Sequence, residues 1–183
     1  MLQNREIVIG VSGGIAAYKA AALTSQLVQA GAHVTAVLTG NARKFIGAAT
    51  FAALTGRPVA SRSFDLAYPL GAHIELAAKA DLLVVAPATA GLLAKAAHGM
   101  ADDLLTTLLL CAECPVLYCP AMNAAMWAKP AVQRNVETLA ADGATIVPPG
   151  TGWLSCRQSG AGRMAEPADI AAAITASLAA PRP

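Results

Sequence analysis

Charged and aromatic side chains are scarce in this sequence, and no apolar run is long enough to cross a membrane. Charged residues make up 13% and aromatic residues 4% of the chain, while 56% of its residues are hydrophobic. The apolar stretch 82–94 is too short to span a bilayer and contains Pro87. Asn4, Arg5 and Glu6 interrupt the N-terminus, so no signal peptide is expected. This composition excludes a disordered chain and predicts a cytoplasmic protein without membrane contacts.

Clustered basic charge is also absent. The 13 lysine and arginine residues nearly balance 11 acidic residues, for a formal net charge of +2, and no basic run occurs. Nucleic-acid binding needs such clusters, so it is not expected. Few charges are available to cover the surface of a 183-residue chain. Part of the apolar excess is therefore predicted to lie in contacts between identical subunits.

The four cysteines lack the spacing of a metal site. Cys111 and Cys114 form a Cys-x-x-Cys pair, but no second pair and no histidine-rich spacing completes a tetrahedral set. Cys111 ends an apolar helical pattern, and Cys119 ends a strand pattern. We therefore expect no metal and interpret most of the cysteines as small buried hydrophobic residues in a reducing compartment.

Short apolar runs alternate with helical patterns along the chain. Strands are predicted at 7–11, 34–38, 82–86, 116–119 and 145–147, and helices at 15–30, 42–54, 71–80, 88–97, 102–111, 131–141 and 168–178. Continuous apolar strands between helices indicate a parallel sheet covered on both faces. The prediction is a single-domain, doubly wound α/β fold that binds ligands at the carboxyl ends of its strands.

Two segments show neither the helical nor the strand period. Residues 57–70 are predicted to be an irregular connecting segment. Residues 148–167, with four glycines before Arg163, are predicted to form a long flap loop. Unstructured segments of that length in compact domains are usually functional. The domain is expected to span residues 1–180, followed by a tail at 181–183.

The first candidate site follows the first predicted strand. The segment Gly10-Val-Ser-Gly-Gly-Ile-Ala-Ala-Tyr-Lys19 places glycines and Ser12 directly before a helix. Glycines let the backbone approach an anion, and a helix start offers unpaired N–H groups and a favourable dipole. The motif matches neither the dinucleotide fingerprint nor the P-loop, so a mononucleotide phosphate such as that of FMN fits better. A tight strand–helix turn without a ligand is the alternative.

His73 is the second candidate, in Gly71-Ala-His-Ile-Glu-Leu76 after the irregular connecting segment. A lone histidine is more often structural than catalytic, but an imidazole can act as an acid or a base. Glu75 and His33 are weaker candidates, and His98 is interpreted as a helix-end residue.

Two further motifs directly follow strand patterns. Ala86-Pro-Ala-Thr-Ala-Gly91 combines small residues with a hydroxyl, which suits a flat ligand close to the backbone. In Pro120-Ala-Met-Asn-Ala-Ala-Met-Trp127, Asn123 can both donate and accept, as needed for holding a carboxylate or an amide. A turn with a core methionine and tryptophan remains the alternative. Asp102 and Asp103 are interpreted as helix N-caps, because adjacent helix positions do not face each other.

Cys156 lies in the flap loop, within Trp153-Leu-Ser-Cys-Arg-Gln-Ser-Gly-Ala-Gly-Arg-Met164. On a polar loop that also carries arginines, it is the cysteine best placed to react. An exposed thiol without a role is the alternative.

Taken together, these motifs resemble the homo-oligomeric flavin-containing cysteine decarboxylases, and within that family the phosphopantothenoylcysteine decarboxylases of coenzyme A biosynthesis. The resemblance runs over residues 7–170 and rests on five segments in order. They are Val-Ser-Gly-Gly-Ile-Ala-Ala-Tyr-Lys, His-Ile-Glu-Leu, Ala-Pro-Ala-Thr-Ala, Ala-Asp-Asp-Leu-Leu and Pro-Ala-Met-Asn-Ala-Ala-Met-Trp. Each segment alone is a weak signal, whereas the ordered set is highly specific.

The resemblance implies a Rossmann-like flavoprotein that binds FMN and decarboxylates a cysteine carboxylate. In the family, flavin oxidation of the thiol side gives a thioaldehyde, which acts as the electron sink for loss of carbon dioxide and leaves an enethiolate. In coenzyme A synthesis the reduced flavin then returns a hydride, so that phosphopantothenoylcysteine becomes phosphopantetheine. The resemblance also implies an active site between the subunits of a trimer, often grouped into a dodecamer.

Particular residues acquire roles through this resemblance. FMN contacts are implied for Ser12, Gly13, Gly14, Ile15, Thr39, Phe45, Thr89, Ala90, Gly91, Asp102 and Ala121. Catalytic roles are implied for His73, Asn123 and Cys156. Substrate contacts are implied for Asn123, Met126, Arg163 and Met164.

The flap departs from the family pattern and leaves the substrate open. The family usually has Ala-Cys-Gly-Asp where this chain has Ser155-Cys156-Arg157-Gln158. A peptide ending in cysteine, decarboxylated to an aminoenethiol in peptide natural-product biosynthesis, is therefore the alternative substrate. The retained Cys156 favours phosphopantothenoylcysteine. A flavin prenyltransferase would not need Asn123, and a non-catalytic regulatory flavoprotein would have lost His73 or Cys156, so both are less favoured.

Overall fold

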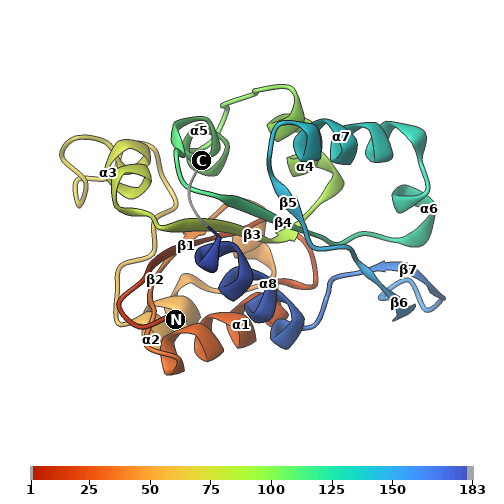
Figure 1. Ribbon diagram of the computed structural model, residues 1–183, viewed down its shortest axis with the longest axis horizontal. Helices are drawn as coiled ribbons and strands as arrows, with labels where there is room; N and C mark the ends of the chain where they lie inside the picture. Colours follow the sequence, from red (N-terminus) through yellow and green to blue (C-terminus); the bar gives the residue numbers. More distant parts are fainter. Residues whose placement is uncertain (1, 181–183) are drawn as a thin grey trace.

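The computed structural model describes residues 2–180, and the predicted tail at 181–183 lies outside them. A parallel sheet with the strand order β2-β1-β3-β4-β5 runs through the molecule (Figure 1). Its strands are β1 (Glu6–Val11), β2 (His33–Leu38), β3 (Leu82–Ala88), β4 (Val116–Pro120) and β5 (Thr145–Ile146). The chain moves outward from β1 to β2 and then returns past β1 to β3. This order is that of a doubly wound fold and confirms the predicted class.

Helices cover both faces of the sheet (Figure 1). One face carries α1 (Ala17–Gln29), α2 (Ala48–Thr55) and α8 (Pro167–Ala179), and the other carries α3 (Ala72–Lys79), α4 (Ala90–Ala97), α5 (Leu104–Cys111) and α7 (Pro130–Ala141). In β1, Ile7 and Ile9 pack toward the α1–α8 face, whereas Val8 packs toward the opposite face. Alternate residues of one strand thus serve two apolar layers, which explains the continuous apolar runs in the sequence.

Two of the predicted elements differ from the structure in ways that have a physical reason. The helix expected at 42–54 is broken into a short 3₁₀ turn, η1 (Ala42–Lys44), and helix α2, because the backbone at Gly47 is extended. Strand β3 was expected to end before Pro87 but continues to Ala88. The register between β3 and β4 shifts at this point, and a proline, which has no N–H to donate, is tolerated at such an irregularity.

The flap loop expected at 148–167 contains an antiparallel hairpin of β6 (Gly150–Trp153) and β7 (Ser159–Arg163). Its base packs beside the short helix α6 (Ala124–Trp127), which the sequence also failed to indicate. The amide of Met122 donates to the carbonyl oxygen of Gly162 at 3.0 Å, and Gly160 lies against Ala124. Glycine-rich strands give no hydrophobic alternation, so backbone pairing and these tertiary contacts define the hairpin.

Among the described residues, no helix combines the length and the apolar character that crossing a bilayer requires. Within the same residues, no group of three His, Cys, Asp or Glu side chains is arranged to hold a metal ion.

Candidate active site

Three loops converge where the sheet changes winding direction, beyond the carboxyl ends of β1, β2 and β3. Ser12 Oγ donates to the carbonyl oxygen of Pro87 at 2.6 Å and accepts from the amide of Thr89 at 3.0 Å. A side chain at Gly13 would lie 2.9 Å from the backbone carbon of Asn41, so glycine permits this close approach of two loops. The crevice at such a switch point is the usual ligand site of this fold.

The start of α1 opens into this crevice and suits an anion. Its first turn contains no acidic side chain and has no side-chain cap. The amides of Gly13, Ile15 and Ala16 have no backbone partner among residues 2–180. Unpaired amides and the positive end of the helix dipole together favour a phosphate group. Ser12 is buried beneath this loop, where its hydroxyl joins the loops that follow β1 and β3.

Most other residues expected to contact FMN surround the crevice. Thr39 Oγ1 accepts from the amide of Ala42 at 3.2 Å, which fixes the turn after β2. Thr89 caps α4 by accepting from the amide of Leu92, so its side chain orients the next loop. A methyl group at Gly91 would meet no atom within 4 Å, which leaves open space at this position for a ligand.

Apolar groups complete the rim of the crevice. Ile15 is 57% exposed and Phe45 is 51% exposed, so both present large apolar surfaces outside the core. Ala90 begins α4, and the amide of Ala121 donates to the carbonyl oxygen of Ala88 at 3.0 Å, which places the chain after β4 beside the end of β3. The residues present therefore fit a flavin mononucleotide.

The two adjacent aspartates have different surroundings. Asp103 caps α5 by accepting from the amide of Thr106 at 2.9 Å, as expected for an N-cap. Asp102 is not a cap: its exposed carboxylate lies 2.6 Å from the Lys95 ammonium. The hydrogen bond from Lys95 lowers the pKa of Asp102.

His73 lies near the start of α3, with its ring half-buried. Its Nδ1 atom is buried and has no hydrogen-bond partner among the described residues. Leaving a buried polar atom unpaired costs about 1–3 kcal/mol, so this atom needs an explanation such as a ligand or a partner from another chain. Helix α3 lies at one end of the long axis of the molecule, and α6 and the hairpin lie at the other (Figure 1).

Asn123 and the hairpin occupy the same side of the molecule. Asn123 Oδ1 accepts from the amide of Met126 at 2.8 Å and caps α6. Its side-chain NH₂ group has no partner within residues 2–180 and remains available to a ligand. Cys156 is exposed in the turn between β6 and β7, where the amide of Arg157 donates to the carbonyl oxygen of Leu154. One chain therefore brings Asn123 and the Cys156 hairpin to one end but leaves His73 at the other.

The remaining residues expected to contact substrate differ in accessibility. Met126 is 43% exposed beside Asn123. Arg163 pairs with Glu166 at 2.9 Å at the base of the hairpin. Met164 is buried in the core with 2% exposure, so its side chain does not reach the surface of this subunit.

Sequence reasoning gave no role to Lys19, although it ends the first motif. Its side chain is buried, and the ammonium group donates to the carbonyl oxygen of Met164 at 3.0 Å and to Glu166 at 2.9 Å. Lysine is almost never fully buried unless it is paired, so no sequence pattern identified this contact.

The expectation that most cysteines are buried holds fully only for Cys119. Its burial raises the pKa of its thiol to about 12. Cys111 and Cys114 are half-buried, and Cys156 is exposed.

The crevice and the sheet define a flavin-binding α/β protein, and the chain belongs to the Flavoprotein family, whose model matches residues 1–179. It is 52% identical over 167 residues to the coenzyme A biosynthesis bifunctional protein CoaBC of Mycobacterium tuberculosis (strain ATCC 25618 / H37Rv). That alignment covers 91% of this chain and 40% of the relative. The chain thus spans about two fifths of the length of the curated relatives it matches.

Two solved structures are similar over nearly the whole chain. The FMN-dependent cysteine decarboxylase SpaF has a TM-score of 0.84 and 39% identity, covering 97% of each chain. A PPC decarboxylase mutant complexed with pantothenoylaminoethenethiol has a TM-score of 0.85 and 30% identity, covering 95% of this chain and 98% of the other. These likenesses confirm the predicted family and the Rossmann-like fold. The predictions of FMN as the cofactor and of a cysteine decarboxylase agree with what these two structures are named for.

Proposed function

We propose that this chain uses FMN to decarboxylate the cysteine carboxylate of phosphopantothenoylcysteine, giving phosphopantetheine in coenzyme A biosynthesis. The observation that carries the proposal is the 52% identity to CoaBC, which extends over 91% of the chain. When bound, FMN would supply a two-electron acceptor that creates an electron sink next to the carboxylate, and it would return the two electrons after carbon dioxide is lost, so that the reaction is redox-neutral overall.

In this proposal two exposed side chains, Asn123 and Cys156, act on the substrate. The free NH₂ group of Asn123 donates to the departing carboxylate and orients it, because its Oδ1 is held by the Met126 amide. Cys156 supplies a proton to the enethiolate carbon once the hairpin covers the substrate. Its position at the tip of β6–β7 supports this role, since the tip is exposed and the base is fixed beside α6.

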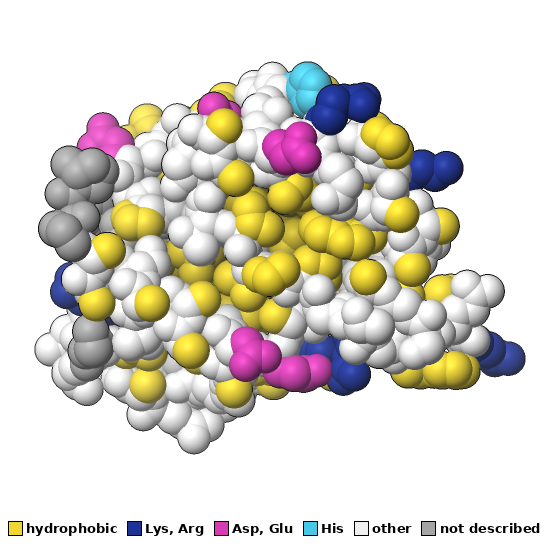
Figure 2. Space-filling model, turned by 45° about the vertical axis from the view of Figure 1, so that its right-hand side comes forward, with side chains coloured by type: hydrophobic (Ala, Val, Ile, Leu, Met, Phe, Trp, Pro, Cys, Tyr) yellow, Lys and Arg dark blue, Asp and Glu magenta, His cyan; other side chains and the backbone are white. Residues whose placement is uncertain are grey.

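His73 acts in a site shared between subunits, in this proposal. Its ring lies at the opposite end of the molecule from Asn123, so a neighbouring copy has to supply one of the two (Figure 1). Figure 2 shows hydrophobic side chains gathered across the middle of the face that includes the hairpin side, where the surface is hollowed. An apolar face of this kind supports packing against another subunit in a trimer or a dodecamer.

A peptide that ends in cysteine is the second candidate substrate. Two features of the hairpin favour it: the departure at Ser155–Gln158 and the side chain of Trp153, which is 67% exposed beside the turn. An exposed aromatic side chain on a two-stranded ribbon is suited to lie against an extended peptide.

Mass spectrometry of anaerobic reactions distinguishes the two substrates. Phosphopantothenoylcysteine that loses only carbon dioxide would support the coenzyme A reaction. A cysteine-terminated peptide that loses carbon dioxide and two hydrogens, with the small molecule untouched, would support peptide modification. Turnover of neither substrate by the FMN-loaded protein would contradict both proposals.

A further inference from the structure

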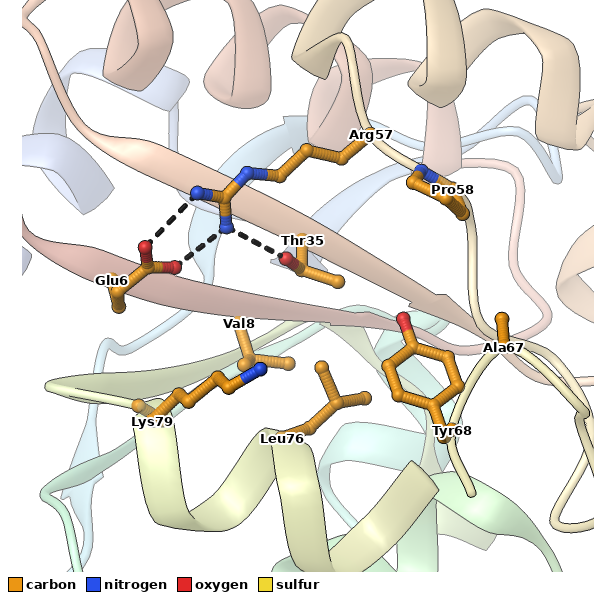
Figure 3. Close-up of a pocket in the computed structure, with 10 residues that line it drawn as sticks. Glu6, Val8, Thr35, Arg57, Pro58, Ala67, Tyr68, Leu76 and Lys79 are labelled. Carbon is orange, nitrogen blue, oxygen red and sulfur yellow. Dashed lines mark hydrogen bonds and ion pairs between the residues drawn. The ribbon is translucent and has the colours of Figure 1, made fainter. Parts of the chain in front are cut away.

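A second cavity lies away from the flavin crevice, between the irregular connecting segment and helix α3 (Figure 3). It has a volume of about 230 Å³. Strands β1 and β2 form its floor near their amino-terminal halves, through Glu6, Val8 and Thr35. None of the residues expected to contact FMN or the substrate lines it.

The Glu6–Arg57 pair closes one side of this cavity. The Arg57 guanidinium donates to both carboxylate oxygens of Glu6, at 2.6 and 2.9 Å, and to Thr35 Oγ1 at 3.3 Å. This pairing lowers the pKa of Glu6 and raises that of Arg57, so both remain charged at neutral pH. The negative charge of Glu6 is thereby offset by Arg57 and does not repel an anion.

Two further polar groups point into the same space from the opposite side (Figure 3). The ammonium group of Lys79 and the hydroxyl of Tyr68 have no hydrogen-bond partner among residues 2–180. Burial, followed by the charges of the Asp65 and Glu75 carboxylates, raises the pKa of Tyr68, so its hydroxyl stays protonated and can donate. The residues that line the cavity include one carboxylate, one guanidinium and one ammonium group and so carry one net positive charge, whereas Asp65 and Glu75 lie outside the lining.

Apolar side chains separate these donors. Val8 and Leu76 lie between Lys79 and Tyr68, and Pro58 and Ala67 complete the wall (Figure 3). A volume of about 230 Å³ is smaller than the pockets that hold drug-sized ligands, so the occupant is a small molecule. A ligand that fits this lining has one negative charge near the donors and an apolar body that contacts Val8 and Leu76.

We propose that this cavity is a binding site for a small organic carboxylate with an apolar body, held by Lys79 and Tyr68. The site is separate from the flavin crevice and does not depend on the decarboxylation proposed above. Because α3 also carries His73, an occupant contacts the same helix as the histidine.

The test uses benzoate as the probe and the FMN-loaded oligomer as the protein. Isothermal titration with the unaltered protein should show saturable binding of benzoate, whereas the uncharged isostere benzamide should bind at least tenfold more weakly. Lys79→Met should weaken benzoate binding about tenfold or more, because a charge-assisted hydrogen bond is lost. Ala67→Leu, at an exposed position of the wall, should also weaken it by filling the cavity.

Arg134→Met is the matched control, because Arg134 is an exposed cation on α7 that does not line this cavity. It should leave benzoate affinity unchanged. The proposal is overturned if benzoate does not bind the unaltered protein, if benzamide binds equally well, or if Lys79→Met and Ala67→Leu both retain full affinity. Circular dichroism and the flavin spectrum establish that each variant is folded.

Discussion

The buried ammonium group of Lys19 lies 2.9 Å from Oε1 of Glu166, and this contact joins helix α1 to the base of the hairpin. Lys19 belongs to α1, whose start opens into the crevice, and Glu166 directly precedes α8. Arg163, the last residue of β7, binds the same carboxylate at 2.9 Å. The position of the hairpin is therefore tied to the helix that is expected to hold the FMN phosphate.

Replacement of Lys19 tests this connection. Lys19→Met keeps the apolar stem but loses two hydrogen bonds, so we expect the free energy of unfolding to fall by about 1–3 kcal/mol. Limited proteolysis should also cut the hairpin faster than in the unaltered protein. Lys129→Met, at an exposed lysine, should change stability by less than about 0.5 kcal/mol in urea unfolding. Equal stability and equal proteolysis of the two variants would refute the connection.

Gly13→Ala should weaken FMN binding. The new methyl group would lie within 2.9 Å of the Asn41 backbone, so one of two crevice loops has to move, at a cost of about 1–3 kcal/mol. Gly40→Ala is the control, because a side chain there meets no atom within 4 Å. The flavin absorbance of the purified variants measures retention, and full retention by Gly13→Ala would contradict this view of the crevice.

Stability at acidic pH should depend on Glu6. The hydrogen bond from Arg57 lowers the pKa of Glu6 below its ordinary value of 4.5. A lowered folded-state pKa means that the pair stabilises the protein above about pH 4.5, and that this contribution is lost as the pH falls through the folded value. Urea unfolding should therefore separate Glu6→Gln from the unaltered protein at pH 7, and the difference should shrink below pH 4. A constant difference at both pH values would exclude this linkage.

Thiol labelling should distinguish Cys156 from Cys119. Cys156 is exposed, whereas burial raises the pKa of Cys119 to about 12 and shields it from reagents. Iodoacetamide should modify Cys156 first in the native protein, and Cys119 only after unfolding. Cys156→Ser serves as the control and should lose the fast phase. Early labelling of Cys119 by peptide mapping would show that the core opens readily.

Mixed oligomers test whether the active site is shared between subunits. His73→Asn and Asn123→Ala should each still bind FMN, because neither side chain holds the crevice loops together. Each variant should lose turnover, because each lacks a side chain that is proposed to act on the substrate. Oligomers reassembled from both variants should regain part of the activity, since some sites combine an intact His73 with an intact Asn123. Mass spectrometry should first show that oligomers containing both variants have formed. If these mixed oligomers are inactive, one chain supplies both His73 and Asn123.

The sheet was predictable because each of its strands is marked in the sequence by a run of apolar residues. Every residue of β3 is buried, and a continuous apolar run indicates such a strand directly. The hairpin carried no such signal, since Gly150, Gly152, Gly160 and Gly162 give no alternation and its position depends on contacts with residues 122–124. Tertiary contacts of this kind are not encoded in any local window.

The site was predictable one motif at a time. Each motif follows a strand or begins a helix, and the topology then gathers the crevice loops around Ser12 and Thr89. Three features depend on the folded molecule instead: the burial of Met164, the pairing of Lys19 and the distance of His73 from Asn123. Side-chain burial and subunit boundaries are global properties, so local spacing gave no indication of them.

The hairpin fixed at its base and exposed at its tip has an evolutionary consequence. Residues 155–158 are all exposed, so substitutions there disturb neither the apolar layers nor the strand ladder. Selection for a new substrate can therefore act on a few tip positions while the ancestral scaffold and its cofactor chemistry are inherited unchanged. Divergence between paralogues of this kind should be concentrated in that turn.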